Sequence, residues 1–72
     1  MNANANPDRI VRIKTVLNRT GLSRSTMYRK IKEGTFPRQV PISINGAGWR
    51  ESAINLWIED PAAFHMRVRE LE

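Results

Sequence analysis

The sequence predicts a mainly α-helical domain with a small β-hairpin. Two short helical segments are separated by a tight turn at residues 20–23, an alternating apolar run with an Asn-Gly pair follows, and a third helical segment comes after it. This order of elements is that of a winged helix-turn-helix, which we expect over residues 9–60. A chain of 72 residues can form one such domain with a thin core.

The N-terminal part is expected to be a leader followed by a strand and a helix. Residues 1–8 begin with the Asn- and Ala-rich run MNANANP, so we assign them to a disordered leader. Residues 9–13 contain β-branched side chains in rough alternation, which suits a short strand. Residues 14–20 read as a helix that Gly21 ends, because a left-handed residue costs least without a Cβ.

The second helix is the best-defined local element. Ser23 is a strong N-cap candidate, a helix over residues 24–33 follows, and Gly34 ends it. Met27 and Ile31 share one side, which should face the core. The other side and its shoulder carry polar and basic side chains: Arg24, Ser25, Tyr28, Arg29 and Lys32.

The hairpin is predicted over residues 40–50 and would form the wing. Residues 39–44 read as a strand in which Pro41 indicates an edge position. Asn45-Gly46 is expected to begin a turn over residues 45–48, with residues 49–50 as the return strand.

The C-terminal part is predicted to hold two more helices. Residues 51–59 carry an apolar stripe of Ile54, Trp57 and Ile58. We expect core packing for Trp49 and Trp57 rather than stacking on single-stranded nucleic acid. Asp60 and Pro61 are expected to start a helical extension over residues 61–72. Its apolar face could pack back on the domain or pair with a second copy, and both readings stay open.

The charge distribution favours a polyanionic partner. Residues 9–50 carry ten of the twelve Lys and Arg residues and one of the seven acids, Glu33. Such a field attracts nucleic acid because each neutralised phosphate releases condensed counterions. There is no cysteine and no long apolar run, so we expect no disulfide, no membrane span and a location in the cytoplasm or bacterial nucleoid.

The second helix offers the candidate contacts with double-stranded DNA. Guanidinium and hydroxyl groups suit guanine edges and phosphates in the major groove. The candidates from the helical pattern are Ser23, Arg24, Ser25, Tyr28, Arg29 and Lys32, although Tyr28 could equally be a half-buried packing residue. In the wing, Arg38 and Arg50 could touch phosphates, and Asn45 and Gly46 at the uncharged tip could contact DNA through the amide or the backbone.

Enzyme activity is not expected. His65 is the only histidine and has no candidate nucleophile near it in the sequence. Glu59 and Asp60 are more plausible as helix-end residues than as an acid–base pair. No phosphate-binding glycine loop or metal-ligand spacing is present, so we predict no cofactor and no metal.

Several of these segments together resemble the AlpA family of phage and prophage regulators. The segments are residues 9–13, Val16-Leu17, the run GLSRSTMYRKIKEGTFP (21–37), GWRES (48–52) and LWI (56–58). The family is similar to MerR-type winged helix-turn-helix domains and to phage excisionases. The resemblance covers about residues 9–59 and implies a bacterial transcription regulator with its second helix in the major groove. By position it implies recognition roles for Ser23, Arg24, Ser25, Thr26, Tyr28 and Arg29.

Two features depart from the family pattern, and three functions stay open. Pro41 stands where a basic residue is more usual, and the tip of the wing is uncharged. The chain could be a sequence-specific DNA-binding regulator, an excisionase-like DNA-bending factor that acts with an integrase, or an adaptor that uses its C-terminal apolar face to bind protein.

Overall fold

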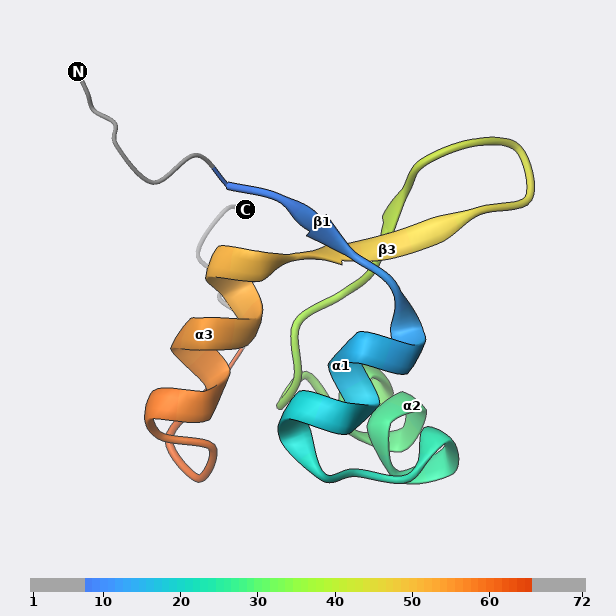
Figure 1. Cartoon of the computed structure of the whole chain (residues 1–72). Coiled ribbons are helices and arrows are strands. Elements are labelled where there is room, and N and C mark those ends of the chain that lie inside the picture. The colour runs from blue at the N-terminus through green and yellow to red at the C-terminus, as the bar shows by residue number, and fades with distance from the viewer. Residues whose placement is uncertain (1–7, 66–72) are drawn as a thin grey trace, which may run out of the picture.

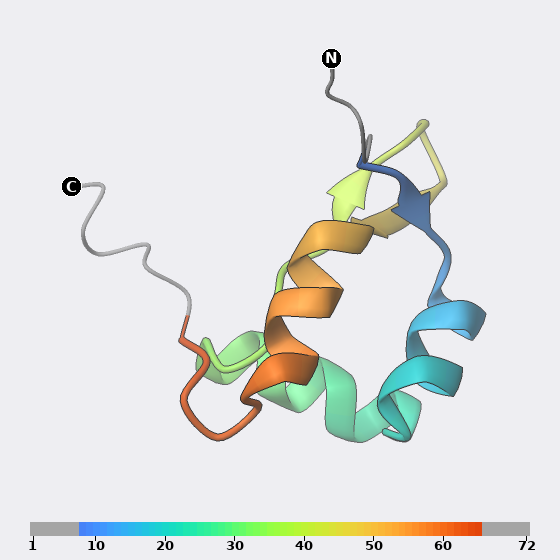
Figure 2. The same cartoon turned by 60° about the vertical axis from the view of Figure 1, so that its left-hand side comes forward.

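A computed structural model describes residues 8–65, so the predictions for residues 1–7 and 66–72 lie outside the described part. Within that part, the fold consists of three helices and a three-stranded antiparallel sheet (Figure 1). The elements, in chain order, are β1 (Ile10–Val11), α1 (Ile13–Thr20), α2 (Arg24–Glu33), β2 (Val40–Pro41), β3 (Ala47–Arg50) and α3 (Glu51–Glu59). Figure 2 shows the sheet at one end, α2 across the other end, and α1 and α3 between them.

The helices follow the local patterns of the sequence closely. α2 and α3 have the predicted bounds, and α1 begins one residue earlier than expected, at Ile13. Gly21 and Gly34 end α1 and α2 in the left-handed region, with φ of 76° and 85°. The side chain of Ser23 accepts a hydrogen bond from the Thr26 amide at 3.2 Å, so it caps α2 as predicted.

The sheet differs from the prediction in the turn of the hairpin. β3 lies in the centre and β2 at an edge, as the position of Pro41 indicates. However, the return strand begins at Ala47, because Ala47 and Gly48 pair with Pro41 and Val40. The turn is instead closed by the Ile42 amide, which donates to the Gly46 carbonyl at 2.8 Å.

The predicted turn over residues 45–48 is therefore wrong in its position. The bend lies at residues 43–45, and Ala47 and Gly48 belong to β3. The loop protrudes from the sheet, and Ile44, which we expected to continue the strand, is 97% exposed.

Gly48 allows the three strands to approach one another. A Cβ at this position would collide with Cγ2 of Ile10 and would lie 3.0 Å from both the Val11 carbonyl oxygen and Cδ1 of Ile42. Ile10 and Ile42 belong to the flanking segments, so the glycine is required by packing on both sides of β3.

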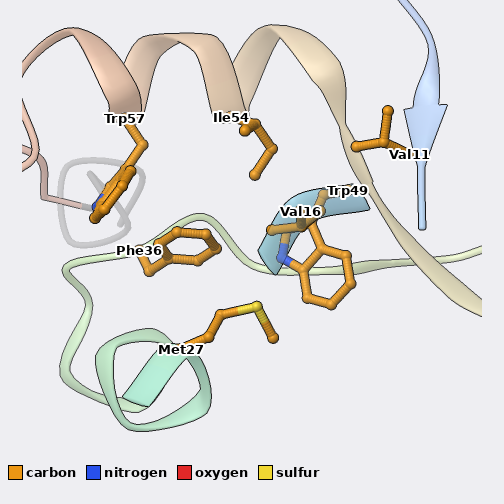
Figure 3. Close-up of a cluster of buried hydrophobic side chains, with 7 residues drawn as sticks. All are labelled: Val11, Val16, Met27, Phe36, Trp49, Ile54 and Trp57. Carbon is orange, nitrogen blue, oxygen red and sulfur yellow. The ribbon is translucent and has the colours of Figure 1, made fainter. Parts of the chain in front are cut away.

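One core joins the described elements. Figure 3 shows its side chains converging between α2, α3 and the sheet. The buried residues are Val11, Val16, Met27, Phe36, Trp49, Ile54 and Trp57. Phe36 packs edge-to-face on Trp57 with ring centroids 5.0 Å apart. Burial of Trp49 and Trp57 confirms the expected core role of both indoles.

The two indoles also hold the segment that follows α2. Trp49 Nε1 donates to the Pro37 carbonyl, and Trp57 Nε1 donates to the Thr35 carbonyl, both at 3.0 Å. Because Trp49 lies on β3 and Trp57 on α3, these bonds attach the end of α2 to the rest of the domain.

The helix expected after Asp60 is not present in residues 61–65. The Asp60 amide donates to the Trp57 carbonyl at 3.2 Å, so Asp60 ends α3 and does not begin a new helix. Residues 61–63 form a single turn, closed by the bond from the Ala63 amide to the Asp60 carbonyl. Phe64 then packs, partly buried, against the core. Across residues 8–65, no helix combines the length and the apolar character that a membrane span requires.

Candidate nucleic-acid interface

One side of α2 is exposed and carries polar and basic groups. Met27 is buried and Ile31 half-buried on the inner side, as the helical period predicts. The exposed residues at the start and on the outer side are Ser23, Arg24, Ser25, Tyr28, Arg29 and Lys32. Exposure is what a contact with DNA requires, and the contact itself stays a prediction.

The start of α2 is organised by its own hydrogen bonds. The Ser23 hydroxyl donates to the Thr26 hydroxyl at 2.9 Å as well as accepting from the Thr26 amide. Thr26 is half-buried, whereas the three residues before it, 23–25, are exposed. The main role of Ser23 and Thr26 is therefore to cap the helix. The groups of the first two turns that remain accessible to a partner are Arg24, Ser25 and Tyr28.

Arg29 has a nearby acid within α2. Its Nε lies 3.8 Å from Oε2 of Glu33, and both side chains are more than half exposed. An exposed pair of this kind on one helix contributes little to stability. Arg29 can exchange this partner for a phosphate or a base edge at small cost.

The predicted wing residues do not lie together. Arg38 and Asn45 are exposed, whereas Gly46 is half-buried and a Cβ added there would lie 2.7 Å from the Ser43 hydroxyl oxygen. Arg50 lies at the far end of β3, where its guanidinium nitrogen is 3.6 Å from a carboxylate oxygen of Asp8. Arg50 is thus part of another cluster of charges, away from the loop.

Two segments share one side of the molecule with the hairpin loop. Both views place the loop, the β1–α1 connection and the turn before α2 along the same edge (Figures 1 and 2). The connection is Arg12, and Lys14 follows in the first turn of α1; both are exposed. Neither residue was among the candidates from the sequence, although the recurrence of basic residues at 9, 12 and 14 could have suggested them.

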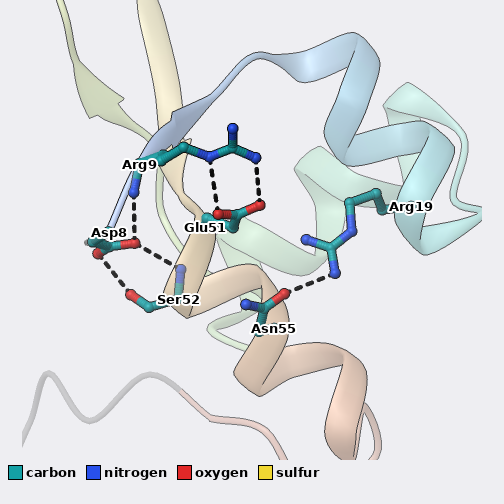
Figure 4. A network of polar contacts seen from close by, with 6 residues as sticks. All are labelled: Asp8, Arg9, Arg19, Glu51, Ser52 and Asn55. Atoms are coloured by element: carbon teal, nitrogen blue, oxygen red, sulfur yellow. Dashed lines mark hydrogen bonds and ion pairs between the residues drawn. The ribbon is translucent and has the colours of Figure 1, made fainter. Parts of the chain in front are cut away.

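A network of polar contacts joins the N-terminal segment to α3 (Figure 4). One carboxylate oxygen of Asp8 accepts from the Ser52 amide at 2.9 Å, and the other accepts from the Ser52 hydroxyl at 2.7 Å. Arg50, at the N-cap position of α3, makes no side-chain capping bond of its own. Asp8 therefore caps a helix that begins more than forty residues later, and its assignment to a disordered leader is wrong.

The same network binds several basic side chains to acids and amides. The Arg9 guanidinium donates to both carboxylate oxygens of Glu51, at 3.0 and 3.1 Å, and Arg19 donates to Asn55 at 2.7 Å. The Arg9–Glu51 and Asp8–Arg50 pairs reduce the positive field beside α3, whereas the neutral amide of Asn55 leaves the charge of Arg19 in place. The other basic groups that can attract a polyanion lie on α2, at Arg12 and Lys14, and at Arg38.

Hydrogen bonding lowers the pKa of the two acids in this network. Bonds from the Ser52 amide and hydroxyl are the main causes that lower the pKa of Asp8, and the bond from Arg9 is the main cause that lowers the pKa of Glu51. Both groups are thereby held in the charged form. Residues 8–65 contain no group of His, Cys, Asp or Glu side chains that could hold a metal ion.

Comparison with known proteins identifies the family. The model of the family described as prophage CP4-57 regulatory protein (AlpA) matches residues 9–62. The chain belongs to the AlpA family. The match confirms the resemblance carried by the α1–α2 segment and by the residues around Trp49 and Trp57.

Two relatives of this AlpA-family chain are known from phage and bacterial sources. An uncharacterized protein of enterobacteria phage P4, ORF88, is 37% identical over 51 residues, which cover 71% of this chain and 58% of the phage protein. The DNA-binding transcriptional activator AlpA of Escherichia coli K12 is 30% identical over 56 residues, which cover 69% of this chain and 80% of that protein. None of the solved structures matches the chain.

Replacement of Asp8 by Asn should make this AlpA-family domain less stable in a pH-dependent way. Because the pKa of Asp8 is lowered in the folded state, its contribution is complete above the ordinary carboxyl pKa and is lost as the pH falls through the lowered value. We expect a lower Tm for Asp8→Asn at pH 7 and a smaller difference from the parent protein below pH 4.

The matched control is Glu59→Gln, which removes an exposed acid at the other end of α3. Thermal melts followed by circular dichroism between pH 3 and pH 7 would make the comparison. Equal Tm values for the parent protein and Asp8→Asn across this range would contradict the role of Asp8 as a cap.

Proposed function

We propose that this chain is a sequence-specific regulator of transcription that binds double-stranded DNA and belongs to a phage or prophage. The observation that carries the proposal is the outer side of α2, where Arg24, Ser25, Tyr28, Arg29 and Lys32 are all exposed. The name of the Escherichia coli relative, a DNA-binding transcriptional activator, supports the same function.

In the proposed complex α2 enters the major groove with its N-terminal turns towards the bases. Arg24, Ser25 and Tyr28 lie within these turns and are accessible. A guanidinium can donate to O6 and N7 of guanine, a hydroxyl can bind bases or phosphates, and a tyrosine ring can contact a thymine methyl group. Arg29 and Lys32, further along the helix, would reach a guanine edge or the phosphates.

The hairpin between β2 and β3, residues 40–50, would be the wing of a winged helix-turn-helix. Its loop lies on the same side as the start of α2 (Figures 1 and 2), so both elements can face one duplex. The indole bonds to Thr35 and Pro37 support this arrangement, because they hold α2 on the body that carries the hairpin. A homodimer through residues 61–72 and an integrase partner stay predictions.

The first experiment is a selection of bound duplexes from a random pool at 0.15 M salt. We expect enrichment of one motif, and a palindromic motif would support dimeric binding. If the chain were instead a protein-binding adaptor, it would show no affinity for any duplex at this salt concentration. That result would contradict the proposed function.

Arg29→Ala should weaken binding to the selected motif by about 1–3 kcal/mol if Arg29 contacts a guanine, and should relax the preference at that base pair. If Arg29 binds only phosphate, specific and non-specific affinity should fall together and the salt slope should decrease by about one. Fluorescence anisotropy with labelled duplexes over a range of salt concentrations separates the two results.

The matched control is Arg19→Ala, which removes the same charge from α1 beside Asn55. Its affinity should stay close to that of the parent protein. If Arg29→Ala and a Ser25→Ala/Tyr28→Ala double variant both bind like this control, α2 is not the element that contacts DNA.

A further inference from the structure

The tip of the hairpin presents one isolated apolar side chain to solvent. Ile44 is 97% exposed, far more than any other large hydrophobic residue in the described part of the chain. The loop that carries it is well organised, since the Ile42 and Ser43 amides both donate to the Gly46 carbonyl, at 2.8 and 3.3 Å. The exposed isoleucine adds no burial energy to the fold, and the ordered loop holds it in a position where it is available for an external contact.

The surroundings of Ile44 do not form a patch for another protein. Ser43 and Asn45 on either side are polar and exposed, and the next apolar residue, Ile42, is only half exposed (47%), with its Cδ1 close to Gly48. A stable protein–protein interface buries more than about 1,000 Å², which one projecting side chain cannot provide. Isoleucine is, however, among the side chains that DNA-bending proteins insert between base pairs from the minor groove.

The position of the loop relative to α2 fits a contact with the adjacent minor groove. The loop and the start of α2 lie along one edge of the molecule, with the β1–α1 connection between them (Figures 1 and 2). The exposed residues Arg12, in that connection, and Lys14, in the first turn of α1, can bind the phosphate strand that separates the two grooves. The amide of Asn45 suits the acceptors that A·T pairs present in the minor groove.

We propose that Ile44 is an apolar wedge that enters the minor groove beside the major-groove site of α2 and bends the DNA there. This inference rests on the proposed function, because α2 must first bind the duplex. Insertion of one such side chain unstacks a base step and bends the helix towards the major groove, typically by about 20–90°. Flexible pyrimidine–purine steps should be preferred at the inserted position.

The test uses the full chain and the duplex motif recovered by selection, placed at different positions in fragments of equal length. Bending makes the mobility of the complex in a gel depend on the position of the site. For Ile44→Ser we expect the bend angle to fall by about half or more and affinity to fall by about 10-fold, as expected for the loss of one buried apolar side chain. Ile44→Met, which keeps an apolar side chain, should keep most of the bend.

The matched control is Leu56→Ser, which removes an exposed apolar side chain from α3 and should change neither the bend nor the affinity. An unchanged bend for Ile44→Ser, or a parent complex without any bend, would overturn the wedge. Reduced self-association of Ile44→Ser in sedimentation, with the bend unchanged, would show that Ile44 contacts a second protein instead.

Different experimental results would contradict the wedge and the proposed function. If the proposed function is wrong, the parent chain has no affinity for duplex DNA and no bend can be measured. If only the wedge is wrong, the parent protein and Ile44→Ser bind the selected motif with equal affinity and give the same dependence of mobility on position.

Discussion

Trp49→Ala is expected to lower the free energy of unfolding by about 3–5 kcal/mol. Trp49 is 1% exposed and lies at the point where β1, β3 and the segment after α2 meet. Its removal leaves a cavity in a core of seven buried hydrophobic residues, which cannot collapse without separating these elements. A domain of this size has a total stability of about 4–11 kcal/mol, so much of the protein should unfold.

Urea denaturation followed by circular dichroism measures this loss. Trp49→Phe keeps most of the ring volume but removes the Nε1 donor, so that the buried Pro37 carbonyl loses its partner and stability falls by about 1–3 kcal/mol. Leu56→Ala, at an exposed position on α3, is the control and should change stability by less than about 0.5 kcal/mol. If Trp49→Ala lowered the free energy of unfolding by less than about 1 kcal/mol, Trp49 would not be the residue that holds β1, β3 and the segment after α2 together.

Gly48→Val should destabilise the domain by about 3 kcal/mol, at the upper end of the range for overpacked sites. The new Cβ would meet Cγ2 of Ile10 and would lie 3.0 Å from the Val11 carbonyl oxygen. The first contact lies close to the backbone of β1 and the second is backbone itself, so side-chain rotation cannot relieve the crowding. The strands must move apart, which weakens the pairing of β3 with β1.

Gly46→Ala provides a matched control in the same hairpin. An added Cβ there would lie 2.7 Å from the Ser43 hydroxyl oxygen, at the end of a side chain that can rotate away. Its Tm should therefore stay within a few degrees of the parent value, whereas Gly48→Val should melt roughly 10 °C or more below it. Similar melting temperatures for the two variants would show that the strands are free to separate at Gly48.

The helices could be predicted from the sequence because their ends depend on local chemistry. Ser23 and Gly34 delimit α2 through bonds to residues at most four positions away. The burial of Met27 and the exposure of Arg29 follow from the helical period. The exposed outer side of α2, which forms most of the candidate site, could therefore be predicted from the sequence.

The hairpin turn and the cap of α3 could not be predicted in the same way. The Asn-Gly pair favours a turn that begins at Asn45, but Ala47 and Gly48 pair with Pro41 and Val40 inside β3, where Gly48 lies close to β1 and Ile42. Asp8 caps α3 through a contact between residues 44 positions apart, for which the sequence has no local pattern. The charge count likewise could not reveal that Arg9 and Arg50 are paired with acids.

The bonds from Trp49 and Trp57 to the segment after α2 have a consequence for how DNA would be selected. They fasten α2 to the body that bears the hairpin, so the separation between helix and loop is set before any encounter. If both elements occupy neighbouring grooves, the duplex has to match this fixed spacing. Base pairs that the protein never contacts would then influence affinity, because their sequence determines how easily the minor groove narrows and the duplex twists or kinks.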